Sequence, residues 1–317
     1  YTSLNGGNKW HQLKGGLPTI SFRDLAIQKR ENDLVGASFG RGFYILDDYS
    51  PLRGVIEESM NKEAHLFPIK DAWWYIPRPV LSFGGKGSQG AGHFVAPNPD
   101  FGAIITYHLK ADYQSMEEER KEEEKKNKVQ DIAFPGWDVL EKEKMEQKPA
   151  IFIVIKDSNG NVIRRINAPA KKGVHRVAWD LHYPSTDAIR STKLTVKPED
   201  EPKGLMAAPG QYTASIIKMA DGKSTELSAP QTFTVKRLRE GSLKGSTPEA
   251  TAAFWRELEA INLDVSGISV LLKENQDKLK RMTIALSRSQ SEPGELDKQL
   301  HDLSTRLQLM SKKLNGD

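Results

Sequence analysis

The chain contains no cysteine, and this absence excludes three kinds of chemistry at once. Without thiols there is no disulfide, no thiolate ligand for a metal ion and no cysteine nucleophile. The missing cysteine does not fix a cellular compartment, because many exported bacterial proteins also lack it.

Long hydrophobic runs are missing as well. No stretch of about 18 apolar residues occurs, so we expect no membrane-spanning helix. Hydrophobic residues make up 38% of the 317 positions and charged residues 28%. This composition predicts several small cores in two or three small domains rather than one large core.

The charge balance gives little reason to expect a nucleic-acid partner. The chain has 46 basic and 42 acidic residues, for a formal net charge of +4. Lys and Arg are interleaved with Asp and Glu, whereas nucleic-acid binders gather basic charge on one face or along one helix.

Residues 1–57 read as short strands separated by turns. Apolar or β-branched runs occur at Ile20–Ile27, Asp33–Ala37 and Phe43–Leu46, with glycine-rich turns between them. Four strands in about 45 residues are the size of one β-propeller blade. A single blade cannot bury both of its faces, so we expect the other blades to lie outside this chain. Because the chain begins with Tyr1 inside an expected strand and shows no signal-peptide pattern, we expect a fragment or processed product.

Residues 58–240 predict an immunoglobulin-like or fibronectin-like β-sandwich. The strongest local signal is the turn Asp157–Gly160 between two apolar runs. Asp221-Gly222 marks a second expected hairpin, between Gln211–Met219 and Gln231–Val235. Residues 112–148 interrupt this pattern with charged helices, one expected over Met116–Lys128 and one over about Trp137–Gln147.

Residues 247–317 change to a helical period and predict an antiparallel helical hairpin. Thr247, Pro248 and Glu249 have the order of an N-cap, a first-turn proline and an acidic first turn. Asn275 falls at a seam position, where we expect it to help set register. The seam positions are Leu258, Ile261, Val265, Ile268, Leu272, Asn275, Leu279, Met282 and Leu286, then Leu296, Leu300, Leu303, Leu307, Met310 and Leu314.

The run from Ser3 to Trp10 carries the first of several family resemblances. Ser3, Asn5, Gly7 and Trp10 resemble the Asp-box S-x-D-x-G-x-x-W, with Asn5 in place of the usual aspartate. We expect this motif to be structural, its polar side chains tying a hairpin turn to backbone N–H groups and its Trp packing into the blade. The run Gly40–Asp48 is similar to the closing blade of bacterial sortilin-like BNR/Asp-box repeat propeller proteins, which are often labelled glycosyl hydrolases.

The resemblance to this family extends over roughly residues 1–240. It implies an exported bacterial protein, periplasmic, outer-membrane-associated or extracellular, whose propeller binds a peptide, protein or glycan. One departure is Lys236–Leu238, where the family commonly has Asp-Pro-Arg. The other matching runs are Asn98–Ala103, Phe134–Trp137, Asp157–Arg164, Arg176–Leu181 and Pro209–Thr213.

We predict no catalytic, cofactor-binding or metal-binding residue in this chain. Asp47 and Asp48 are adjacent on an expected strand, so their carboxylates point to opposite faces and do not converge on one bond. The run Gly85–Gly90 spells G-x-G-x-x-G, but a strand-like segment follows it where a nucleotide site needs a helix. None of the seven histidines has H-x-H or H-x-x-x-H spacing.

Two aromatic groups are candidate contacts for a ligand or partner. Adjacent aromatics at Trp73, Trp74 and Tyr75 place rings on both faces of an expected strand. They either contact a sugar ring or partner, or pack between the sandwich and its neighbours. Phe254 and Trp255 lie partly off the helical seam, where they either pack back onto the sandwich or meet another protein.

These patterns leave two main functions open. The first is a non-catalytic C-terminal region that closes a propeller and mediates protein or glycan binding and assembly at the cell envelope. The remaining blades would come from upstream or from another chain. The alternative is an accessory region of a sialidase-like glycoside hydrolase whose active site lies in the missing blades. A third hypothesis is a subunit of a larger envelope assembly that uses the helical hairpin as its interface.

Overall fold

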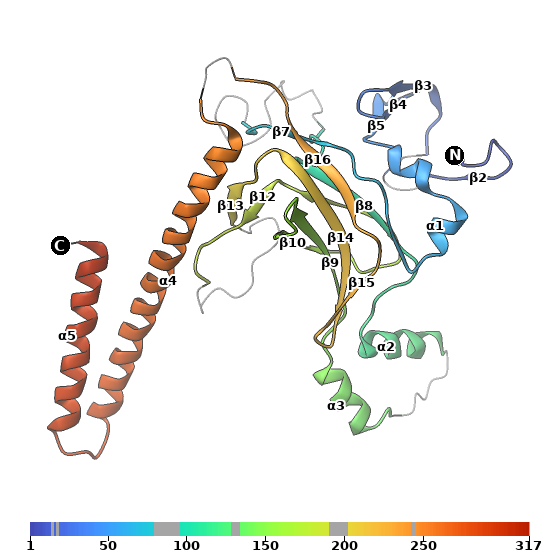
Figure 1. Cartoon of the computed structure of the whole chain (residues 1–317). Coiled ribbons are helices and arrows are strands. Elements are labelled where there is room, and N and C mark those ends of the chain that lie inside the picture. The colour runs from blue at the N-terminus through green and yellow to red at the C-terminus, as the bar shows by residue number, and fades with distance from the viewer. Residues whose placement is uncertain are drawn as a thin grey trace. The chain divides into compact units, whose positions relative to one another are not determined.

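The computed structural model describes residues 1–13, 16, 19–78, 96–127, 134–189, 202–241 and 245–316 (Figure 1). The chain forms two compact units. Unit 1 comprises Tyr1–Leu181 and Pro209–Ser242, and unit 2 comprises His182–Ala208 and Leu243–Asp317. This division keeps the first 57 residues with the strands that follow and places 182–208 with the C-terminal helices. The three predicted domains stay a prediction.

A six-stranded sheet is the largest element of unit 1. The first predicted hairpin is confirmed, because β9 turns into β10 at Asp157–Gly160. The second differs from the prediction: β14 turns at Asp221-Gly222 into a short strand, β15, and the predicted partner strand β16 pairs with β14 without being joined to it by that turn. In the first turn, Asp157 Oδ1 accepts the N–H groups of Asn159 and Asn161, each at 2.9 Å. The pairs are antiparallel except for the parallel pair β16–β7. The order is β10 (Val162–Ala168), β9 (Ala150–Asp157), β14 (Gly210–Ala220), β16 (Gln231–Arg237) and β7 (Ala72–Trp74), with β15 (Lys223–Glu226) also on β14.

A three-stranded sheet of unit 1 shares its core with the six-stranded one. Its order is β11 (Gly173–Trp179), β8 (Ala103–Leu109) and β6 (Ala64–Leu66). Trp179 of β11 is fully buried, and its ring centroid lies 5.0 Å from that of Tyr212 on β14 and 6.2 Å from that of Phe233 on β16. Unit 1 is therefore β-rich, with two sheets sharing one apolar core.

In the described part of residues 1–57, the strands form two small sheets. β1 (Thr2–Ser3) pairs with β2 (Trp10–His11), and β3 (Phe22–Gln28), β4 (Asp33–Ser38) and β5 (Phe43–Leu46) form an antiparallel meander. The expected strands are therefore present, but as a hairpin beside a three-stranded sheet. A 3-10 turn, Ser50–Gly54, and α1, Glu57–Asn61, lead out of the meander.

The predicted helices of the 112–148 region are confirmed as α2 (Met116–Lys126) and α3 (Trp137–Met145). Ser115 caps α2 by accepting the Glu118 N–H at 3.3 Å. Arg120 joins the two helices, because its guanidinium donates to Glu143 at 2.7 Å and to Glu124 at 2.6 Å.

Unit 2 contains the predicted helical hairpin, α4 (Pro248–Ser287) and α5 (Glu295–Asn315). Thr247 caps α4 by accepting the Ala250 N–H at 3.2 Å. Asn275 differs from the prediction, because it is exposed and its amide donates to the Leu271 carbonyl of the same helix at 2.8 Å. The short strands β12 (His182–Pro184) and β13 (Lys203–Met206) complete unit 2. Among the helices in the described ranges, none combines the length and the apolar composition needed to cross a membrane.

Gly102 is expected to be the least replaceable glycine of unit 1. A Cβ atom there would lie 1.9 Å from the Trp179 carbonyl oxygen, and its φ of +109° is unfavourable for any L side chain. Gly102→Ala should therefore lower the free energy of unfolding by about 3 kcal/mol or more, measured by urea denaturation. Gly222→Ala is the matched control, since Gly222 has a φ of +73° but no atom within 4 Å. The control should lose only about 1–2 kcal/mol, and equal losses would contradict the close contact.

Leu272 and Leu271 give a second matched pair, in unit 2. Leu272 is 7% exposed, whereas its neighbour Leu271 is 59% exposed. We expect Leu272→Ala to cost about 2–4 kcal/mol through the cavity that it leaves, and Leu271→Ala to change stability by less than about 0.5 kcal/mol. Urea denaturation followed by far-ultraviolet circular dichroism measures both. A larger loss for the Leu271 variant would contradict this packing of α4.

Candidate functional site

The aromatic residues near β7 lie at the edge of the six-stranded sheet. Alternation along the strand places Trp73 and Tyr75 on one side and Trp74 on the other. Trp73 and Tyr75 are exposed, and Tyr75 contacts Phe101 edge to face with ring centroids 4.9 Å apart. The structure therefore brings two of the three predicted contact residues to one surface and separates Trp74 from them.

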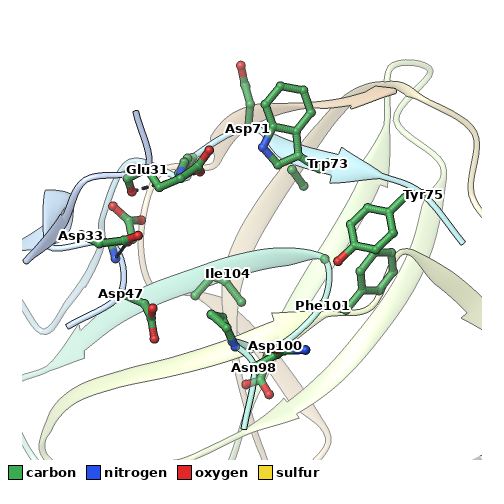
Figure 2. Close-up of a pocket in the computed structure, with 15 residues that line it drawn as sticks. Glu31, Asp33, Asp47, Asp71, Trp73, Tyr75, Asn98, Asp100, Phe101 and Ile104 are labelled. Atoms are coloured by element: carbon green, nitrogen blue, oxygen red, sulfur yellow. Dashed lines mark hydrogen bonds and ion pairs between the residues drawn. The ribbon is translucent and has the colours of Figure 1, made fainter. Parts of the chain in front are cut away.

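Trp73 and Tyr75 form one wall of a cleft of about 340 Å³ in unit 1. Figure 2 shows Asp33 and Asp47 across the cleft from these rings, with the Ile104 side chain between the two walls. The cleft thus has an aromatic wall and an acidic wall. Aromatic rings beside a few polar groups are typical of ligand-binding clefts.

Asp33 and Asp47 come together through strand pairing. Leu34 of β4 pairs with Leu46 of β5, so the next residues along, Asp33 and Asp47, also lie opposite each other on one side of the sheet. The sequence analysis considered Asp47 only with its neighbour Asp48 and missed this pair. The antiparallel pairing of two short apolar runs was the signal that could have found it.

The acidic wall has a perturbed carboxyl group. Burial raises the pKa of Asp47, and the negative charge of Asp33 raises it further, whereas Arg176 acts in the opposite direction. Asp33 Oδ1 accepts the N–H of Asp48 at 3.0 Å.

Two other carboxylates that line the cleft are ion-paired with lysines. Glu31 pairs with Lys70, whose hydrogen bond lowers the pKa of Glu31. Asp71 pairs with Lys236, whose hydrogen bond lowers the pKa of Asp71, and also accepts the Thr234 N–H at 3.0 Å. Lys70 and Lys236 therefore balance the negative charges of Glu31 and Asp71 at the cleft.

Arg176 of β11 fixes the loop that carries Asp47. Its guanidinium donates to the Asp47 carbonyl oxygen at 2.6 Å and to the Asp48 carbonyl oxygen. These bonds attach the end of β5 to the three-stranded sheet of β11, β8 and β6. Arg176 also belongs to one of the runs that resemble the propeller family. The sequence analysis therefore singled out this run, but it did not predict that Arg176 binds the carbonyl groups at the end of β5.

The residues that resemble an Asp-box lie in the β1–β2 turn. Ser3 Oγ accepts the Gly7 N–H at 2.7 Å, and Asn5 Oδ1 accepts the Lys9 N–H at 2.9 Å. Gly7 has a φ of +95°, which favours glycine. Trp10 pairs with Ser3 across the hairpin, and its ring is exposed rather than packed within the described part of unit 1.

The aromatic pair of α4 lies in unit 2. Phe254 and Trp255 meet edge to face at 5.9 Å, and both are exposed. Trp255 also lines a polar cleft of about 260 Å³ with Glu259 and Asn262. The two predicted roles of these rings, packing on the sandwich or contact with another protein, both stay predictions.

The remaining sequence candidates add no chemistry to either cleft. The G-x-G-x-x-G run, Gly85–Gly90, lies outside the described residues. Within the described ranges, no three His, Asp or Glu side chains are grouped so that they could hold a metal ion.

Comparisons with known proteins found no match. No family model matches the chain, and no curated protein or solved structure does so either. The geometry and chemistry of the chain's own residues therefore carry the functional argument.

The pKa of Asp47 is raised and that of Asp71 is lowered, so removing each charge should change stability in the opposite direction. The folded-state pKa of Asp47 is raised above the ordinary aspartate value. Ionising this group therefore costs the folded protein free energy as the pH rises from the ordinary value through the raised one. Asp47→Asn should increase the free energy of unfolding at neutral pH, by less than about 1 kcal/mol because the group is partly solvated. The gain should disappear below the ordinary aspartate pKa, where Asp47 is protonated in both states.

Asp71→Asn is the matched comparison, because the folded-state pKa of Asp71 is lowered. Its contribution is present above the ordinary aspartate pKa and is lost as the pH falls through the folded value. The variant should therefore lose up to about 1 kcal/mol at neutral pH and nothing at strongly acidic pH. Urea titrations across the acidic range measure both variants, and the same sign for both at neutral pH would refute the assignment.

Proposed function

We propose that this chain is a non-catalytic region that closes a β-propeller and mediates protein or glycan binding at the cell envelope. In this proposal β3, β4 and β5 belong to the last blade, and the two larger sheets form an immunoglobulin-like or fibronectin-like sandwich. One observation carries it: the small β3–β4–β5 sheet exposes apolar side chains on both of its faces.

Strand register assigns these side chains to opposite faces. Residues directly across from one another share a face, and the pairs Ala26↔Val35↔Ile45 and Ala37↔Phe43 define the first. The pair Ile27↔Leu34 and the residue Leu25 define the second. The exposed fractions are 76% for Phe43, 60% for Ile45, 64% for Leu25 and 53% for Ile27.

A sheet with this distribution requires cover on both sides. Sheets of a few strands become stable when an apolar face is buried, and extensive exposed apolar surface marks an interaction site. Most soluble sheets bury one face and present a polar second face to water. A propeller blade has other blades beside it around the ring, which accounts for two apolar faces. The missing cover would come from blades elsewhere in the polypeptide or in another chain.

The resemblance of residues 1–240 to sortilin-like BNR/Asp-box proteins supports the same proposal. The Ser3 and Asn5 hydrogen bonds to the turn of β1 and β2 are consistent with a structural role for that motif. On the same resemblance we propose export from a bacterial cell, to the periplasm, the outer membrane or the outside.

Thiol labelling tests the proposed cover, because the chain has no cysteine of its own. Ile45→Cys places a single thiol on the first apolar face of the small sheet. We expect fast labelling by a maleimide reagent in the 317-residue chain alone and at least tenfold slower labelling in the protein assembled as in its source cell.

Thr225→Cys on exposed β15 is the control, and it should label at the same rate in both preparations. Equal labelling of the Ile45 variant in both preparations would reject the proposed blade. Glycoside hydrolysis by the native assembly, lost on substitution of acidic residues in its propeller, would instead favour the accessory role in a hydrolase.

A further inference from the structure

We propose that the cleft between β7 and the ends of β4 and β5 binds a cationic side chain, an arginine or lysine of a protein or peptide partner. This inference rests on the proposed binding function and names the chemistry of the ligand.

The two walls of the cleft define the shape of that ligand. Trp73 and Tyr75 form the aromatic wall, Asp33 and Asp47 form the acidic wall, and Ile104 lies between them (Figure 2). The volume of about 340 Å³ is at the small end of ligand-binding clefts. It matches one or two extended side chains better than a large folded surface.

A long cationic side chain satisfies both walls at once. Exposed aromatic faces attract a guanidinium or ammonium group, and paired carboxylates form charge-assisted hydrogen bonds with it. The methylene stem of arginine or lysine packs against apolar surface while its head stays polar, and Ile104 offers that surface. The aromatic wall is independent of the acidic one, so the assignment does not depend on the carboxylates alone.

The charge of the cleft separates this ligand from other candidates. A sugar with a carboxylate or phosphate would be repelled by Asp33 and Asp47. A neutral sugar would stack on Trp73 but add no positive charge beside Asp33 and Asp47, whose mutual repulsion Arg176 offsets only in part. The nearby carboxylates of Glu31 and Asp71 already have lysine partners. A cation from outside would give Asp33 and Asp47 the kind of partner that Glu31 and Asp71 already have.

The ionisation of Asp47 is consistent with this assignment. Burial and the charge of Asp33 both raise its pKa, so bringing a cation into the cleft relieves an existing repulsion. Peptide affinity should therefore fall as the pH is lowered through the titration of Asp47.

Peptide binding to the 317-residue chain tests the proposal. The probe is a fluorescent Gly-Ser-Arg-Arg-Ser-Gly peptide, measured by anisotropy at low salt. A peptide with citrulline in place of arginine keeps the shape and removes the charge. We expect the arginine peptide to bind and the citrulline peptide to bind at least tenfold more weakly.

Charge-matched variants separate the cleft from general electrostatic attraction. Asp33→Asn/Asp47→Asn keeps the shape of both side chains and should reduce affinity for the arginine peptide at least tenfold. Glu119→Gln/Glu123→Gln on exposed α2 makes the same change in net charge and should leave the affinity unchanged. Trp73→Leu retains an apolar side chain without the aromatic face and should reduce affinity about threefold to tenfold.

Several results would overturn the cationic ligand. These are no binding of the arginine peptide, equal binding of the citrulline peptide, an equal loss in both double variants, or displacement of the peptide by the neutral trisaccharide maltotriose. Circular dichroism of each variant confirms that it is folded. The peptide-binding assay reports on the cleft, whereas labelling of the Ile45→Cys variant reports on the first apolar face of the small sheet. If the arginine peptide does not bind but the thiol of Ile45→Cys is labelled slowly in the assembled protein, the cationic ligand is rejected and the propeller blade is kept. If the peptide binds but the thiol is labelled equally fast in both preparations, the propeller blade is rejected and the cationic ligand is kept.

Discussion

Two cations attach the small β3–β4–β5 sheet to the larger sheets of unit 1 beside the cleft. Arg176 donates to the carbonyl oxygens of Asp47 and Asp48 at the end of β5. Lys70 pairs with Glu31, in the turn that enters β4. These contacts lie at the same end of the small sheet and set its acidic residues opposite the aromatic ones.

The same strands therefore take part in both proposed interactions. β4 and β5 carry apolar residues on their faces, and the residues at one end of each strand form the acidic wall. Covering the faces would limit the motion of both strands and so fix the spacing of Asp33 and Asp47. A cleft held in its binding geometry loses less conformational entropy when a ligand enters. If both proposals hold, blade assembly and cation binding are physically coupled through β4 and β5.

The sequence predicted those structural elements that depend only on residues close together in the chain. The Asp157–Gly160 hairpin, the Thr247 cap and the two helices α4 and α5 all follow from local turn chemistry or period. The predicted seam holds only in part, because Ile268, Met282 and Leu303 are exposed whereas Leu272 is buried. The cleft does not, because Trp73 is brought next to Lys236 by a parallel pairing between distant segments. No local pattern specifies such a pairing. The same limit explains the misplaced role of Asn275, since a heptad position does not decide whether a polar side chain faces the partner helix or bonds to its own backbone.

Periodicity identifies an apolar surface without identifying what covers it, and α4 shows this limit clearly. α4 has 40 residues and α5 has 21, about 60 Å and 32 Å of helix at the standard rise. Because α5 is about half as long, it spans only part of the predicted seam. Leu272 is buried, whereas Ile261 and Val265 are exposed although they continue the same seam. The β3–β4–β5 sheet presents the equivalent case in strands, where alternation predicts apolar residues and register places them on two faces. What distinguishes the sheet is that exposed apolar residues lie on both of its faces, and the proposed blade is one architecture that would cover both, whereas a single exposed stripe calls for cover on one side only.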